Sequence, residues 1–76
     1  IKIYFNDWDV SSVTNMSGMF SYTNIFNQPL NNWNVSKVTN MRGAFNEAFV
    51  FNQPLNNWDV SNVTDMLLMF AGTKAF

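Results

Sequence analysis

The stretch Phe-Asn-Gln-Pro-Leu-Asn-Asn-Trp at residues 26–33 recurs letter for letter at residues 51–58. The chain therefore repeats with a fixed period of about 25 residues, which is typical of repeat architectures built from one small structural unit per repeat. The period predicts a single segment, residues 1–76, made of three repeats at 1–25, 26–50 and 51–76. The partial repeats at both ends indicate a piece of a longer array.

Large apolar residues recur at equivalent positions of the three repeats. A single repeat is too short to enclose a core alone, so neighbouring repeats should stack and align their equivalent residues in columns. The predicted core columns are Trp8, Trp33 and Trp58; Val10, Val35 and Val60; Met16, Met41 and Met66; and Phe20, Phe45 and Phe70, with Phe26, Phe51 and Phe76 closing the pattern.

Spacing within the middle repeat predicts its secondary structure. Trp33 and Val35 lie two positions apart and would face the same side of a strand. Val38, Met41 and Phe45 are spaced by three and four positions, which is the period of one face of a helix. The sequence therefore predicts an α/β repeat solenoid, a right-handed coil of about 25 residues per turn with one short parallel strand and one short helix per repeat.

A longer motif carries a resemblance to a known family. The run from Trp58 to Met66 reads Trp-Asp-Val-Ser-Asn-Val-Thr-Asp-Met and is followed by Met69-Phe70, and residues 30–35 fit the same pattern. It resembles a bacterial surface-protein repeat of the same length, related to the BspA-like leucine-rich repeats and found in Mycoplasma-type lipoproteins. The resemblance implies a leucine-rich-repeat-like coil, export to the cell surface, adhesion and other protein interactions, and no catalytic chemistry.

Composition argues against several functions. Four basic against five acidic residues give a net charge of -1, so the chain offers no basic surface for nucleic acid or an anionic membrane. No apolar run reaches membrane-spanning length, so no direct membrane insertion by this segment is expected. Without His or Cys, the usual nucleophile-base pairs and transition-metal clusters cannot form. We therefore expect no enzyme activity, no catalytic residues, no cofactor and no metal.

A polar row alternates with the inward Trp and Val residues and should face solvent. It consists of Asp7, Asp9, Asn32, Asn34, Asn57 and Asp59. Because its character is polar, regular and repeated, it is the best candidate for an interaction face, although a merely solvated face fits equally well. Calcium binding by the acidic members is disfavoured, because no compact acidic loop with a glycine turn is present.

Three other interpretations of the polar and aromatic residues are less favoured. The Trp column could form a sugar-stacking platform, but its phase with Val35 favours the core. Asn15-Met-Ser17, Asn34-Val-Ser36 and Asn62-Val-Thr64 fit the N-glycosylation pattern, which would matter only in a eukaryotic secretory pathway. Binding to ice by the regular columns is disfavoured, because each repeat supplies only one invariant Thr.

The main functional hypothesis is a segment of an extracellular bacterial surface protein, serving as a rigid scaffold for adhesion and protein interaction. Its partners would be proteins, including those of a host surface or extracellular matrix. The alternative is a structural component that joins further copies of itself into a surface layer or filament, because uncovered ends of a stack invite continued stacking.

Overall fold

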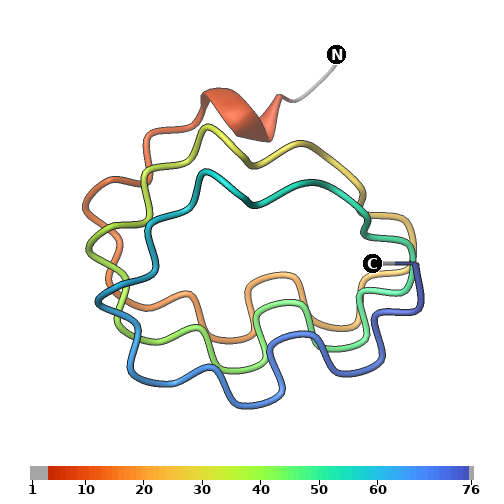
Figure 1. The fold of residues 1–76 in the computed structure, drawn as a ribbon. Coiled ribbons are helices and arrows are strands. Elements are labelled where there is room, and N and C mark those ends of the chain that lie inside the picture. The colour runs from red at the N-terminus through yellow and green to blue at the C-terminus, as the bar shows by residue number, and fades with distance from the viewer. Residues whose placement is uncertain (1–3, 76) are drawn as a thin grey trace.

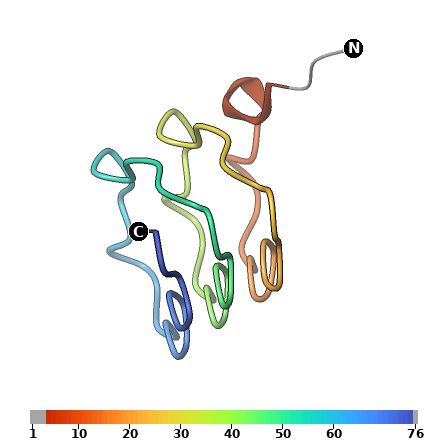
Figure 2. The same cartoon turned by 90° about the vertical axis from the view of Figure 1, so that its right-hand side faces the viewer.

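A computed structural model describes residues 4–75 of the chain. The chain makes three turns that lie one behind another in Figure 1 and side by side, in chain order, in Figure 2. We call them coil 1 (residues 4–25), coil 2 (26–50) and coil 3 (51–75). The described structure measures 31 × 27 × 19 Å along its principal axes.

Regular secondary structure is almost absent from residues 4–75. The one element is a 3-10 helix, η1, at Phe5–Asp7. Backbone pairing of the β type is limited to isolated parallel bridges that join Asn15 to Asn40 and Asn40 to Asp65. The prediction of an α/β solenoid, with a strand and a helix in each repeat, is therefore wrong. The described part of the chain is a stack of irregular coils.

The predicted strand at residues 30–35 is replaced by two tight turns. The Trp33 amide donates to the Leu30 carbonyl at 3.0 Å, and the Val38 amide donates to the Val35 carbonyl at 3.0 Å. Trp33 and Val35 are nevertheless buried on one side and Asn34 is exposed on the other. The inward and outward alternation is present without the backbone ladder that defines a sheet, because these amides bond locally.

The predicted helix at residues 38–45 is replaced by consecutive turns. In a helix the Phe45 amide would donate to the carbonyl of residue 41. Here it donates instead to the Met69 carbonyl of coil 3, at 2.8 Å. Gly43 and Glu47 have positive φ angles of 64° and 56°. A right-handed helix cannot pass through such residues, so each one turns the chain.

Alternate amides of these turns join each coil to the next, and we call these hydrogen bonds the turn row. From coil 1, the amides of Met16, Gly18, Phe20 and Tyr22 donate to the carbonyls of Asn40, Arg42, Ala44 and Asn46 at 2.8–2.9 Å. From coil 2, the amides of Met41, Gly43, Phe45 and Glu47 donate to the carbonyls of Asp65, Leu67, Met69 and Ala71 at 2.6–2.9 Å. Every bond of the turn row points from a coil to the following one.

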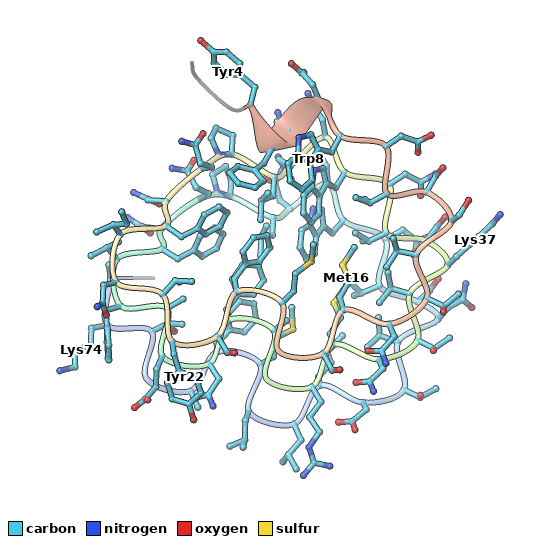
Figure 3. All side chains as sticks on the ribbon, turned by 180° about the vertical axis from the view of Figure 1, so that it is seen from behind. Tyr4, Trp8, Met16, Tyr22, Lys37 and Lys74 are labelled. Carbon is cyan, nitrogen blue, oxygen red and sulfur yellow. The ribbon has the colours of Figure 1, made fainter. Side chains whose placement is uncertain are left out.

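Stacked rings fill the space inside the coils. Trp33 and Trp58 are parallel within 2° with centroids 6.4 Å apart, and Phe26 and Phe51 are parallel within 3° at 5.9 Å. Phe76, which the repeat assigns to the same column as Phe26 and Phe51, lies outside the described residues. The rings project into the interior in Figure 3, whereas Tyr22, Lys37 and Lys74 point outward.

Burial of the predicted core columns depends on the coil. In coil 2 all four members are buried. Buried members are Val10, Met16, Phe20, Trp33, Val35, Met41 and Phe45; Trp58 and Val60 are half-buried; and Trp8, Met66 and Phe70 are exposed. The exposed members belong to coils 1 and 3, each of which has an outer face with no further coil packed on it in the described structure.

Tryptophan suits this core because its indole N–H finds a partner one coil away. Trp33 Nε1 donates to the Phe5 carbonyl, and Trp58 Nε1 donates to the Leu30 carbonyl at 2.8 Å. A buried indole without such a partner would be destabilising. Trp8 instead lies against the Phe5 ring, with centroids 4.6 Å apart.

Replacing the buried tryptophan should therefore destabilise the stack far more than replacing the exposed one. Trp33 is 2% exposed and Trp8 is 47% exposed. Trp33→Ala should lower the free energy of unfolding by about 3 to 5 kcal/mol, through a core cavity. Trp8→Ala should cost less than about 2 kcal/mol. Urea denaturation measures both, and equal losses would contradict the assignment of Trp33 to the core.

In the described structure, three residues with a Cβ atom, Tyr22, Glu47 and Leu68, have an unfavourable left-handed backbone conformation, and Leu68 stands where the other two coils have glycine. Leu68 has a φ of 61°, whereas the equivalent residues Gly18 and Gly43 have φ of 65° and 64°. This left-handed region costs a residue with a Cβ atom about 1 kcal/mol or more and costs glycine little. Coil 3 is therefore locally strained at Leu68.

Leu68→Gly should stabilise the chain by about 1 kcal/mol, by relieving this strain. Leu67 is a matched control, because the two leucines are 53% and 52% exposed and Leu67 has no positive φ. Leu67→Gly should destabilise by about 1 kcal/mol, since glycine loses more backbone entropy on folding. Thermal unfolding followed by tryptophan fluorescence would show the opposite shifts, and shifts of the same sign would contradict the strain.

Candidate functional site

The polar row predicted from the sequence lies on the outside of the three coils, and we call it the outer row. All six members are exposed: Asp7, Asp9, Asn32, Asn34, Asn57 and Asp59. They flank the tryptophans of the three coils, and the turns at residues 30–38 and their equivalents in the other coils hold them outward. The structure divides the row into two sets with different bonding.

The first set holds the backbone of its own turns. Asp9 Oδ1 accepts from the Ser11 amide at 3.0 Å and from the Ser11 hydroxyl at 2.6 Å. Asn34 Oδ1 accepts from the Ser36 amide and hydroxyl in the same way, at 3.1 and 2.7 Å. In coil 3, Asp59 Oδ1 accepts from the Ser61 amide at 3.0 Å. Such Asx turns are local structural devices.

In the second set, the side chains do not bond to other described residues. Within the described residues, the side chains of Asp7, Asn32 and Asn57 make no hydrogen bond or ion pair. Their backbone amides are held: Asp7 donates to the Tyr4 carbonyl at 3.2 Å. The Asn32 amide donates to Asn6 Oδ1 at 2.8 Å, and the Asn57 amide donates to Asn31 Oδ1 at 2.9 Å. A fixed backbone therefore presents three polar groups that are free for a partner.

Sequence reasoning missed the amide side chains that connect the coils. Asn27 Oδ1 accepts from the Asn52 amide at 2.9 Å, and Gln53 Nε2 donates to the Asn27 carbonyl at 2.9 Å. Asn62 Nδ2 donates to the Ser36 carbonyl at 2.7 Å. The signal for part of this set was the recurrence of Phe-Asn-Gln and Leu-Asn-Asn, because an amide can both donate and accept between stacked coils.

Charged groups of the site are few and exposed. Hydrogen bonds from Ser11, first from its hydroxyl and then from its amide, lower the pKa of Asp9, and Ser61 lowers the pKa of Asp59 in the same way. Hydrogen bonds to a carboxylate favour its charged form. Arg42 and Asp65 form an ion pair at 3.8 Å with both side chains exposed, so it adds little stability.

Three further features of the described region concern cavities, metal ions and membranes. The small gap among Met41, Phe45 and Trp58 is lined by apolar side-chain surface and has no room for a water molecule. Among residues 4–75, no three acidic side chains gather closely enough to hold a metal ion. The same residues contain no helix long and apolar enough to cross a membrane.

These features define a repeat segment whose coils are fastened to one another and carry an exposed polar row. A family model described as "Mycoplasma protein of unknown function, DUF285" matches residues 2–76. The match covers nearly the whole chain, so the chain belongs to this family of Mycoplasma repeat proteins. No curated protein and no solved structure shows significant similarity to it.

The lowered pKa values of Asp9 and Asp59 predict a loss of stability in acid. In the folded chain the pKa of each carboxyl group lies below its ordinary value of 3.8. The stability contributed by the ionised carboxylates is therefore complete above pH 3.8 and is lost as the pH falls through the lowered pKa. Asn34 makes the same Asx turn without a titrating group. Asp9→Asn/Asp59→Asn should therefore lose less stability between about pH 5 and about pH 2.

Urea denaturation at several pH values measures this effect, with the unaltered chain as the reference. The remaining carboxylates are present in both proteins, so their titration cancels in the comparison. Parallel stability curves for the two proteins would show that these hydrogen bonds do not depend on the carboxylate charge.

Proposed function

We propose that this chain is a segment of an extracellular bacterial surface protein, and that it acts as a rigid scaffold for adhesion and protein interaction. The proposal includes the relation to BspA-like surface repeats that the Trp-x-Val-Ser-x-Val-Thr-x-Met motif suggests. It also includes protein partners on a host surface or in the extracellular matrix. Membership of a Mycoplasma repeat family is compatible with this role.

The observation that carries the proposal is the difference in side-chain bonding between the two sets of the outer row. Asp7, Asn32 and Asn57 have exposed side chains with no bond inside the described structure, while their backbone amides are held. Because the backbone at these positions is already held, a partner would need to order only the side chains, which reduces the conformational freedom lost on binding. A protein partner with backbone or amide hydrogen-bonding groups at matching intervals would complement this set.

The binding test uses immobilised laminin, fibronectin and collagen, presented one at a time to the chain by surface plasmon resonance. Saturable binding to at least one of them is expected. Asp7→Ala/Asn32→Ala/Asn57→Ala should weaken it by about ten-fold or more, because the contacting groups are removed without loss of an internal bond.

A matched control keeps the outer row intact. Asn24 and Lys37 are exposed and make no hydrogen bond or ion pair in the described structure, and Asn24→Ala/Lys37→Ala should bind as the unaltered chain does. The proposal fails if the unaltered chain binds none of the three proteins, or if the outer-row variant binds equally well. Unchanged unfolding midpoints would show that both variants remain folded.

A further inference from the structure

Apolar side chains are exposed on the side of the stack, where each coil passes into the next. Ile25 and Val50 are 90% and 40% exposed. The residues that follow them, Phe26 and Phe51, stack in parallel with centroids 5.9 Å apart. Ile25 and Val50 therefore hold equivalent places in neighbouring coils. Coil 2 has a coil on each side, so the exposure of Val50 does not come from an uncovered end of the stack.

An aromatic ring and a cation border this pair, and we call Ile25, Phe49, Val50 and Lys74 the corner. The Phe49 amide donates to the Thr23 carbonyl at 3.2 Å, which fixes its backbone against coil 1. Lys74 Nζ lies over the half-buried Phe49 ring, 5.7 Å from its centroid. In the described part of the chain, the Lys74 ammonium forms no ion pair. The corner thus combines exposed apolar surface with a positive charge that has no ionic partner there.

Backbone strain lies next to the corner. Tyr22, three residues before Ile25, has a φ of 59°, and the equivalent residue of coil 3 is Gly72, with a φ of 76°. The conformation costs glycine little and costs a residue with a Cβ atom about 1 kcal/mol or more. The Tyr22 side chain is 67% exposed, so it contributes little to the core. Strained residues of this kind cluster at ligand-binding and switch regions.

We propose that the corner, with Tyr22 beside it, is a docking surface for a protein partner that presents an aliphatic or aromatic side chain next to a carboxylate. The apolar side chain would cover Ile25 and Val50 and remove their surface from water. The carboxylate would pair with Lys74. Charge complementarity favours this partner over a basic or purely apolar one, because either of those would cover the ammonium without compensating its lost hydration.

One carboxylate of the chain opposes this attraction. Glu47 forms no ion pair in the described structure, and its Cγ lies 2.9 Å from the place that a Cβ atom on Gly72 would occupy. Its stem therefore lies against coil 3, at the residue that precedes Lys74 by two positions. A carboxylate of the partner would be attracted by Lys74 and repelled by Glu47. Removing either charge should therefore change binding in opposite directions.

NMR titration of the full chain with labelled methyl groups tests the corner with two matched probes. The acidic probe is acetyl-Glu-Leu-Phe-amide, and the basic probe is acetyl-Lys-Leu-Phe-amide. The acidic probe should shift the methyl signals of Ile25 and Val50 saturably. It should bind about five-fold more tightly than the basic probe, because the two probes differ only in the charge that meets Lys74.

Three charge variants test the pairing with the acidic probe. Lys74→Gln should weaken binding by up to about five-fold, and Glu47→Gln should strengthen it. Lys37→Gln is the matched control, because Lys37 is also exposed and without an ion pair in the described structure but lies at the opposite edge of the coils from Lys74 (Figure 3). It should bind as the unaltered chain does.

An apolar variant tests the rest of the corner. Ile25→Ser/Val50→Ser should weaken binding of the acidic probe about ten-fold or more, because the surface that the probe covers becomes polar. Tyr4→Ser is the control, since Tyr4 is 61% exposed and lies away from Tyr22 and Lys74 in Figure 3. Unchanged unfolding midpoints would show that the variants remain folded, and the Lys74 and Glu47 variants test the corner independently of this one.

Three results would overturn the proposal. The first is the absence of any shift at Ile25 and Val50 with the acidic probe. The second is equal affinity for the two probes, which would show that the apolar surface binds without regard to charge. The third is a set of shifts confined to Val35 and Val60, which adjoin the outer row. The corner shares no residue with the outer row, so the matrix-protein test and this titration can fail independently.

Discussion

The hydrogen bonds of the turn row hold the coils against one another. They also pair backbone N–H and C=O groups that a chain with so little regular structure would otherwise leave without partners. Backbone N–H and C=O groups that leave water need partners. Around Met41 and Phe45 no helix supplies them, so half of the amides bond within tight turns and the other half bond to the next coil. All the hydrogen bonds of the turn row that join neighbouring coils point the same way along the stack. Each coil therefore needs a neighbour of the same shape.

The fixed spacing between coils explains why the sequence repeats side chains as well as turns. Flat rings pack on identical rings, as Trp33 does on Trp58, and stacked aromatic pairs add stability beyond the area that they bury. The indole of each of these residues also reaches a carbonyl of the preceding coil. A different residue at one such position would leave both a gap in the column and a carbonyl without its donor. Side-chain identity is therefore a consequence of stacking and does not require a shared ligand.

Much of this arrangement could be predicted from the period and the phase of the sequence. The repeat period and the inward phase of Trp33 and Val35 relative to Asn34 both appear in the structure. The strand and the helix could not be predicted correctly, because spacing shows which side chains face inward and not where the amides bond. The glycines at 18 and 43 were a usable signal, since they recur at the turns that interrupt a helix. The carboxylates and amides that precede Ser11 and Ser36 by two positions indicated Asx turns in the same way. The free set within the outer row required the structure, because Asp7 and Asp9 look alike in sequence and differ only in what they bond.

The proposed display role rests on coils that are joined through their backbones. Scalar couplings across hydrogen bonds, measured by NMR on isotope-labelled protein, test that connection most directly, because they identify donor and acceptor for each bond. We expect a coupling between the Phe45 amide and the Met69 carbonyl of the following coil. A coupling from the Phe45 amide to the Met41 carbonyl would instead indicate a helix within the repeat and would contradict the account.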